Sequence, residues 1–536
     1  MKRINKILVV GLLMTTFAGG GCKKAWFDIN KDPNTPVESN ITPELVLPPA
    51  MLTTANRVGT SYGFLGHWMS YWAPAANYAP GVEEQSYNIT TTFAQGLFAN
   101  IMDNSNDYKF MERSAAERNL PFYQGIGKIM LAHNFANLVD LYNDVPYSEA
   151  LQSLVYPRPK YDDAKTIYED LIKQIDTGMA LIKGAVVAEN PKIESTDIMF
   201  GGHQSDWAQF GNTLKLRLLM HQASRADRTA YITAELAKIQ AEGSGFLGSG
   251  HDASVAVPYS ADKPNAYYAS YGFNIQGNQA TDFTRANYLV MDSLKRDVDP
   301  RLGYFYKPVV TPRGTTAEAF TQLAPETYRG NKYGLPIDNT TYPAHTANYV
   351  SQVGGIAAAG PVTAASTGLV KGFNQRAWIL TSVESLFLQA EAIERGLLTG
   401  DKKTAYKNAV KESFLWLNVG GSAAAATTAF NNWYDDAEAN LVKSVSYDAA
   451  PDKLRLLQYQ KHLAMNGSNH LEAWVDYRRN GNFPNFPLSA NPGRTSSTIP
   501  YRLLYPQREV DVNTASVPNL GIKSGDQFTG KIWWMP

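Results

Sequence analysis

The sequence predicts a mainly all-α fold, in which tetratricopeptide-like helix pairs form a superhelical scaffold with a packed, loop-rich ligand lobe. Three observations support this prediction. Apolar residues recur at spacings of three and four along several segments, which is typical of amphipathic helices. These segments occur in pairs joined by turns, as in helical repeats. One long interval, residues 243–374, lacks the helical periodicity.

The N-terminus is typical of a secretory signal. Basic residues precede an apolar run that ends at Ala18, and three glycines separate this run from Cys22, the only cysteine. The run has roughly 12 residues and a membrane-spanning helix needs about 20, so we expect export with cleavage before Cys22. This arrangement resembles a bacterial lipoprotein signal, in which the cysteine is lipid-modified. The alternative is an ordinary secreted protein with a leftover thiol.

The clearest helix pair lies within residues 122–182. Its first helix ends near Asn143, because Asp144 and Pro146 predict a turn there. The second helix follows Tyr161 and has one apolar face, which consists of Ala164, Ile167, Tyr168, Leu171, Ile172, Ile175, Met179 and Ile182. Three further pairs are predicted at residues 206–225 with 230–243, 382–398 with 401–418, and 452–467 with 470–481.

The interval between the second and third pairs, residues 243–374, has a different composition. It is rich in Gly, Ser, Thr, Asn, Pro and Tyr. Loops of this length inside a compact body are usually functional or disordered. Apolar and aromatic residues are too frequent here for disorder, so we expect an ordered, loop-rich lobe beside the helices.

Composition and motifs argue against several classes of function. The 49 basic and 49 acidic residues balance, and no basic stripe indicates nucleic-acid binding. No Walker loop, Rossmann fingerprint or G-x-S-x-G motif is present. Residues 28–34 resemble the start of a calcium loop, but Pro33 occupies a position that requires Gly. The eight histidines lack metal-ligand spacing, so we expect no metal and no cofactor, and an enzyme is unsupported.

The most informative feature of the composition is its high aromatic content, with 30 Tyr, 22 Phe and 10 Trp. Many lie in polar segments, and exposed aromatic clusters usually indicate binding. A flat ring can stack on a sugar, and an amide can donate to and accept from its hydroxyls. On this basis the predicted ligand-binding residues are Trp72, Asn77, Tyr78, Tyr268 and Tyr271.

The simpler interpretation of these aromatic residues is core packing. The start of the first aromatic segment could be a helix whose buried face consists of Phe64, Trp68, Tyr71 and Trp72. Pro74 interrupts the predicted helix, and Trp72 and Tyr78 flank it, where a ring faces solvent more readily. Core packing and ligand contact therefore both stay open for these two residues.

Charged residues within the predicted helices have a structural explanation. Lys215 and Arg217 lie among apolar residues, and Asp476, Arg478 and Arg479 end a helix. Positive charge is favourable near a helix C-terminus. We therefore expect ion pairs that fix neighbouring helices rather than a functional site.

Seven separated motifs resemble those of the SusD/RagB-type outer-membrane lipoproteins of Bacteroidetes. In chain order they are DINKDPNTP, LVDLYNDVPYSEAL, WAQFGNTLKLRLLMHQA, SLFLQAEAIERG, EAWVDYRRNG, IPYRLLYPQREVDVN and KIWW. The first of them resembles the SusD-like subgroup with an N-terminal Asp-Pro-Asn signature. The resemblance extends from Cys22 to the C-terminus.

This resemblance implies an organisation and a role. It implies a signal peptide at residues 1–21, a lipidated tether and extended segment at 22–50, and a single SusD-like body at 51–536. The implied protein is anchored in the outer membrane through Cys22, faces the cell surface and is not catalytic. It would bind a nutrient, commonly a glycan, and pass it to a TonB-dependent barrel of the SusC type. We add the hypothesis that a hinged lid movement alternately exposes and encloses the ligand.

Two alternatives to glycan capture stay open from the sequence. A surface-anchored glycan hydrolase would convert its bound polysaccharide slowly and would depend on a single carboxylate. A peptide-binding or assembly scaffold would retain a partner chain and no sugar, as tetratricopeptide-like grooves commonly do. Tyr, Trp and Asn serve both kinds of cargo, so the sequence does not choose between glycan and peptide.

Overall fold

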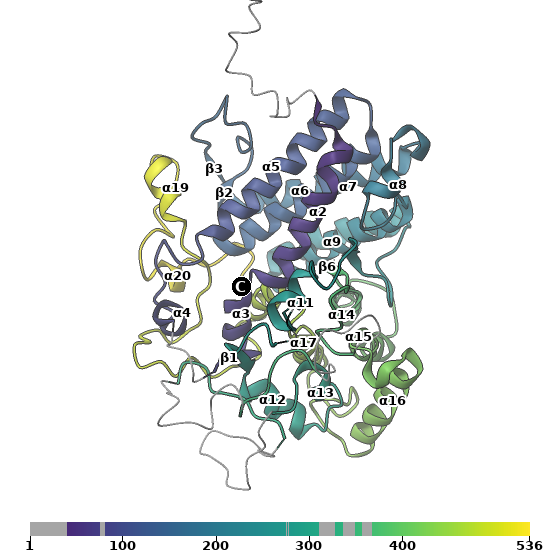
Figure 1. Ribbon diagram of the computed structural model, residues 1–536, viewed down its shortest axis with the longest axis vertical. Coiled ribbons are helices and arrows are strands. Elements are labelled where there is room, and N and C mark those ends of the chain that lie inside the picture. Colours follow the sequence, from purple (N-terminus) through teal and green to yellow (C-terminus); the bar gives the residue numbers. More distant parts are fainter. Residues whose placement is uncertain are drawn as a thin grey trace, which may run out of the picture. The chain divides into compact units, whose positions relative to one another are not determined.

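Helices build most of the computed structural model, which describes residues 40–75, 81–274, 276, 278–309, 327–335, 349–355 and 367–536 (Figure 1). The chain divides into two units, Met1–Thr42 and Pro43–Pro536, and the description below concerns the second. The predicted mainly α-helical class is confirmed. The predictions for Cys22, the stretch 28–34, Asn77 and Tyr78 lie outside the described residues.

The first half of the unit contains three long helices side by side, α5, α6 and α7 (Figure 1). All eight residues predicted for the apolar face of α7 are buried, and Asp163 caps the helix by accepting a hydrogen bond from Thr166 N. The helices of this half are α2 (Pro43–Thr60), α3 (Gly63–Trp68), α4 (Val82–Ser86), α5 (Gly96–Glu117), α6 (Pro121–Tyr142), α7 (Ala164–Gly184), α8 (Ile193–Thr196), α9 (Gln204–His221) and α10 (Thr229–Glu242).

Two glycines set the close approach of α6 and α7. A Cβ atom placed on Gly125 would lie 2.5 Å from Gly178 O, and one on Gly178 would lie 2.8 Å from Gly125 O. Any larger residue would therefore push the helices apart. Glycine lowers helix propensity by about 1 kcal/mol relative to Ala, so these positions favour close packing over local helix stability.

The second half continues the pairing of helices. Helix α14 packs against α15 and α17, and α15 packs against α16. The four predicted pairs are present at α6–α7, α9–α10, α14–α15 and α17–α18. The helices of this half are α11 (Ala266–Tyr271), α12 (Tyr288–Arg296), α13 (Leu302–Phe305), α14 (Ser382–Glu394), α15 (Lys402–Trp416), α16 (Ala423–Ala439), α17 (Lys453–Ala464), α18 (His470–Arg479), α19 (Gln507–Val512) and α20 (Asp526–Thr529).

Short antiparallel strand pairs tie distant segments together. The pairs are β1 (Trp72–Pro74) with β5 (Thr284–Ala286), β2 (Val145–Pro146) with β3 (Tyr161–Asp162), and β4 (Ala253–Val255) with β6 (Ala377–Leu380). Trp72 lies opposite Ala286, and Val145 lies opposite Asp162. The first and third pairs attach described parts of the predicted loop-rich lobe to the helices, although that lobe also contains α11, α12 and α13.

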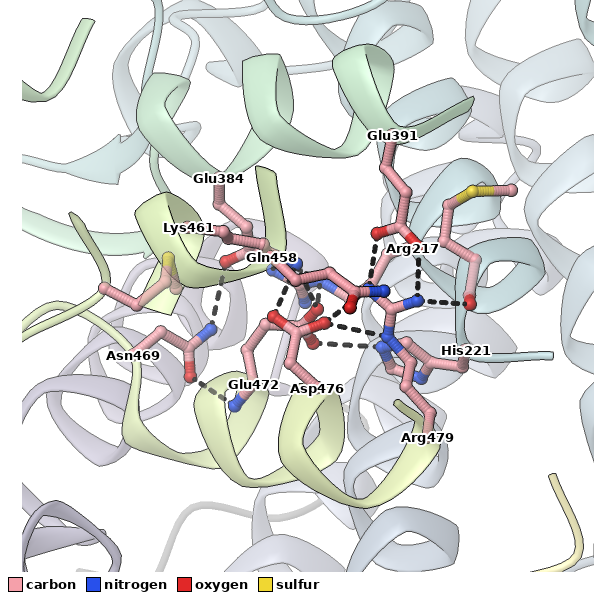
Figure 2. A network of polar contacts seen from close by, with 12 residues as sticks. Arg217, His221, Glu384, Glu391, Gln458, Lys461, Asn469, Glu472, Asp476 and Arg479 are labelled. Carbon is pink, nitrogen blue, oxygen red and sulfur yellow. Dashed lines mark hydrogen bonds and ion pairs between the residues drawn. The ribbon is translucent and has the colours of Figure 1, made fainter. Parts of the chain in front are cut away.

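A buried network of charges joins α9, α14, α17 and α18 (Figure 2). Arg217 on α9 pairs with Glu384 on α14 at 2.5 Å. Lys461 on α17 lies 3.1 Å from Glu472 and 2.7 Å from Asp476, both on α18. Ion pairs between neighbouring helices are thus confirmed for Arg217, and likewise for Lys215 and Arg479. Arg478 instead donates to the backbone oxygens of Asp140 and Tyr501. Because a buried charge without a partner is costly, the network specifies how the four helices meet.

The structure corrects three details of the sequence prediction. Helix α2 begins at Pro43, so residues 43–50 are helical although the segment 22–50 was expected to be extended. Helix α3 ends at Trp68, which leaves Tyr71 and Trp72 outside the predicted aromatic helix. Residues 96–117 and 423–439 form α5 and α16, which were not predicted.

None of the helices formed by the described residues is long and apolar enough to cross a membrane.

Candidate ligand-binding site

The described residues of the predicted aromatic site lie mainly in the interior. The side chains of Trp72 and Tyr268 are only 1 % and 2 % exposed, whereas Tyr271 is half-buried. The structure brings Trp72 and Tyr271 together, with ring centroids 5.0 Å apart. The edge of Trp72 also meets the ring of His470, at 4.3 Å. Ligand contact by these rings stays a prediction, since they mainly contact other side chains here.

An open hollow near this aromatic core has a volume of about 750 Å³. Ligand pockets commonly measure about 300 to 1,000 Å³. Its walls come from the end of α18, the segment that follows it, and α20. The lining residues are Tyr477, Asn482, Asn485, Phe486, Leu488, Thr495, Ser496, Ser497, Thr498, Tyr501 and Phe528.

The chain forms this hollow by turning sharply after α18. Gly481 and Asn482 both adopt left-handed backbone angles, with φ of 69° and 60°, which Gly and Asn tolerate best. The turn brings Phe486 back onto Tyr477, and the two rings stack with centroids 5.6 Å apart and planes 15° apart. Phe486 also contacts the buried ring of His462, at 4.6 Å. The aromatic wall therefore has a fixed position.

Polar groups face the aromatic wall from a second segment, residues 495–501. Thr495 and Ser497 are exposed, and so is Asn485, which also lines the hollow. The Asn482 amide donates to the Tyr501 hydroxyl at 3.4 Å. Thr495 donates to the Asn88 side chain, which in turn donates to Gly493 O at 3.0 Å. The hollow thus adjoins the end of the first aromatic segment identified in the sequence.

This combination of groups suits a ligand with many hydroxyls. Aromatic faces bind the apolar side of a flat ring, and amides and hydroxyls both donate and accept hydrogen bonds. Among the described residues that line the hollow, none is Asp or Glu. Glycoside hydrolysis generally requires two carboxyl groups on opposite sides of the scissile bond. The aromatic, amide and hydroxyl groups of the lining are chemically suited to binding.

A smaller apolar hollow of about 400 Å³ adjoins the first one. The two share Asn485 and Phe486. Leu289, Tyr459 and Leu463 line its apolar wall.

Titratable groups close to the aromatic core are held in one protonation state. Burial lowers the pKa of both His462 and His470 to about 3, so both rings are neutral at physiological pH. Burial also raises the pKa of the Tyr477 phenol above its ordinary value. No group of three or more metal-ligating side chains occurs among the residues that the structure describes.

Sequence analysis did not identify the residues of the hollow. A signal was nevertheless present, because the stretch NGNFPNF after α18 combines aromatic, amide, Gly and Pro residues in the way that residues 61–88 do. The partner segment, TSSTIPY, carries consecutive hydroxyls. After the turn at Gly481, both stretches contribute to the lining of one hollow.

Comparisons with known proteins give a consistent result. A family model described as starch-binding associating with outer membrane matches residues 33–506. A solved chitin-binding protein superposes with a TM-score of 0.69 and 20 % identity, and the alignment covers 92 % of this chain and 99 % of the other. A search of the curated proteins finds no match.

Two further solved structures have the same fold. A SusD homologue from Bacteroides fragilis superposes with a TM-score of 0.67 and 21 % identity, over 89 % of this chain and 95 % of the other. A SusD/RagB family protein from Bacteroides thetaiotaomicron superposes with a TM-score of 0.70 and 19 % identity, over 92 % of this chain and 99 % of the other.

Proposed function

Because the chain belongs to the SusD-like family, whose members associate with the outer membrane, we propose that it captures a glycan at the cell surface. The observation that best supports this proposal is the hollow beside Phe486. It combines stacked aromatic rings with exposed amide and hydroxyl groups, and its described lining contains no carboxylate. Such a surface can hold a sugar chain without cleaving it.

The same proposal includes an anchor and a partner. Cys22 is the residue to be lipidated, and two or more acyl chains would hold the protein on the membrane. The captured glycan would pass to a TonB-dependent barrel of the SusC type, with this protein as a hinged lid over the barrel. Capture requires no cofactor, because transport energy would be coupled through the barrel.

Trp72, Asn77, Tyr78, Tyr268 and Tyr271 remain proposed ligand contacts of a neighbouring subsite. Trp72 and Tyr268 would have to become accessible, since both are buried in the described conformation. Tyr271 is already partly exposed. The hollow beside Phe486 already exposes Asn485, Thr495 and Ser497, although the rings of Tyr477 and Phe486 are themselves only 5 % and 7 % exposed. Its exposed polar groups make it the first place to test.

Native affinity electrophoresis tests the function directly. Residues 23–536, which lack the signal and the lipid, are run through gels that contain soluble starch, glycol chitin or other neutral polysaccharides. Starch and chitin come first because the family description and one similar structure name them. We expect retardation by at least one polysaccharide and no cleavage products. Retention of peptides without retention of any polysaccharide would favour a peptide-binding scaffold, and products that depend on one carboxylate would favour a hydrolase.

A further inference from the structure

A second hollow, of about 450 Å³, lies between β4, β6 and the C-terminal end of α15. It shares no lining residue with the hollow beside Phe486. Its polar lining includes Asp252, Lys371, Gln375 and Arg376, and Trp416 forms part of the wall. We propose that this hollow binds the carboxylate of an acidic sugar through Lys371, Gln375 and Arg376.

The first reason is the balance of charge. Lys371 and Arg376 are the two cations in the described lining, and Asp252 is its one acid. Neither cation forms an ion pair with any other residue that the structure describes. Both carboxylate oxygens of Asp252 are already occupied, by Ser382 N at 2.7 Å and by the Trp416 indole N–H at 2.9 Å. One positive charge in the hollow therefore lacks compensation.

The positions of the two cations favour an incoming anion. The Lys371 ammonium donates to Trp416 O at 2.6 Å and lies 4.4 Å from the centroid of the Trp416 ring. An ammonium has three N–H donors, so this contact leaves donors for a ligand. Arg376 is exposed and donates from Nε to Ser254 Oγ at 2.8 Å and from Nη2 to Met199 O and Ser254 O, which orients its guanidinium and leaves Nη1 for a ligand. Burial lowers the pKa of both groups, and the Asp252 charge offsets this only in part.

The second, independent reason is an unsatisfied donor. Gln375 is 91 % buried, and its side-chain Nε2 has no hydrogen-bond partner. Its orientation is fixed, because Oε1 must accept from Lys371 N at 2.8 Å. A buried N–H group without a partner is destabilising, because it has lost its hydrogen bonds to water. Nε2 itself has almost no accessible surface, so neighbouring side chains must move aside before a carboxylate oxygen can pair with it and neutralise the excess charge.

The surroundings favour a sugar as the carrier of the carboxylate, a choice that rests on the proposed function. Asn374 is exposed and Asn418 is half-buried at the rim, where their amides can pair with hydroxyls. The proposed ligand is thus a uronic acid residue, whose carboxylate contacts the cations while its hydroxyls contact the amides.

Isothermal titration calorimetry of residues 23–536 tests this proposal with sodium D-galacturonate, sodium D-glucuronate, D-galactose and D-glucose. We expect millimolar or tighter binding of at least one uronate, with the matching neutral sugar about tenfold weaker or worse. The substitution Gln375→Glu keeps the acceptor for Lys371 N and replaces the free donor with negative charge. It should weaken uronate binding at least about tenfold. The control Gln240→Glu adds the same charge at an exposed position of α10 and should leave the affinity for uronate unchanged.

Three results would overturn the proposal: no binding of either uronate at millimolar concentration, equal binding of the neutral sugar, or unchanged uronate affinity in Gln375→Glu. If a peptide with a free C-terminal carboxylate bound more tightly than either uronate, the ligand of this hollow would be a peptide and not a sugar. Gln375→Glu should not alter retardation by a neutral polysaccharide, because that ligand is assigned to the other hollow. Failure of this inference is therefore distinguishable from failure of the proposed function.

Discussion

The Arg479 guanidinium donates two hydrogen bonds to the Glu391 carboxylate, at 2.7 and 2.6 Å, and both side chains are completely buried. The pair joins the C-terminal end of α18 to α14 (Figure 2). Burial alone would raise the pKa of Glu391, but Arg479 more than offsets this and holds it well below its usual range.

The substitution Arg479→Met should lower the free energy of unfolding by about 3 to 5 kcal/mol, because it leaves the Glu391 charge buried with fewer partners. Chemical denaturation of residues 23–536 measures this change. Arg508→Met removes an exposed arginine on α19 and should change stability by less than about 0.5 kcal/mol. Equal stability of the two variants would contradict the structural role of the network.

Stability should be highest near pH 6.5 and fall on both sides. Burial holds the pKa of His462 and His470 at about 3, below the value of about 6.5 in the unfolded chain. Below pH 6.5 these two histidines therefore bind protons in the unfolded state but not in the folded state. By pH 5 each of them lowers the free energy of unfolding by about 2 kcal/mol. His221 acts in the opposite direction, because Glu472 and Asp140 outweigh burial and raise its pKa to about 9. The stability that protonated His221 contributes is lost as the pH rises from 6.5 through 9.

Denaturation curves from pH 4 to pH 10 measure this profile. In His462→Gln the loss of stability between pH 7 and pH 5 should shrink by about 2 kcal/mol. His203→Gln, at an exposed side chain, should follow the wild-type profile. An unchanged slope in His462→Gln would show that this ring is not held neutral in the folded protein.

The substitution Trp72→Ala should lower the free energy of unfolding by about 3 to 5 kcal/mol, as expected for removal of a buried aromatic ring. Trp72 is 1 % exposed and packs against His470 and Tyr271. The sequence alone would suggest weaker ligand binding with little effect on unfolding. Thermal denaturation combined with a binding assay separates the two: lost affinity at unchanged stability would make Trp72 a surface contact.

The substitution Cys22→Ser tests the anchor. Without the thiol no lipid can be attached, so the protein should leave the membrane fraction when expressed in a bacterium that processes lipoproteins. Fractionation with an antibody measures its distribution, and metabolic labelling with a palmitate analogue measures lipidation. A variant that stays in the membrane fraction as wild type does would argue against attachment through Cys22.

Helices with one buried face were predictable from the sequence. The periodic apolar face of α7 predicts its burial residue by residue, because one side packs and the other faces water. Helix α5 was not predicted because its buried side includes polar residues such as Asn104, Ser105 and Glu112. These residues interrupt the apolar periodicity by which a helix is identified. Helix α16 was missed although its buried residues recur at helical spacing, namely Ala426, Phe430, Trp433, Tyr434 and Ala437.

The binding surface was less predictable than the helices. Composition indicates that aromatic and amide-rich segments occur, but it does not say which rings end in the core. Trp72 is buried because β1 pairs with β5, more than 200 residues away in the sequence. Tyr477 and Tyr501 meet across one hollow because the chain reverses at Gly481. Such long-range relationships leave no periodic signal in the sequence.

The central claim is that the hollow beside Phe486 holds a glycan without cleaving it. Its most direct test is the affinity of residues 23–536 for the polysaccharide that retards them, compared among wild type, Asn485→Ala, Tyr501→Ala and the exposed control Asn432→Ala on α16. We predict a loss of about 1 to 3 kcal/mol in binding free energy for the first two variants, no loss for the control, and no cleavage products. Unchanged affinity in both Asn485→Ala and Tyr501→Ala, or release of shortened sugars by the wild type, would contradict the claim.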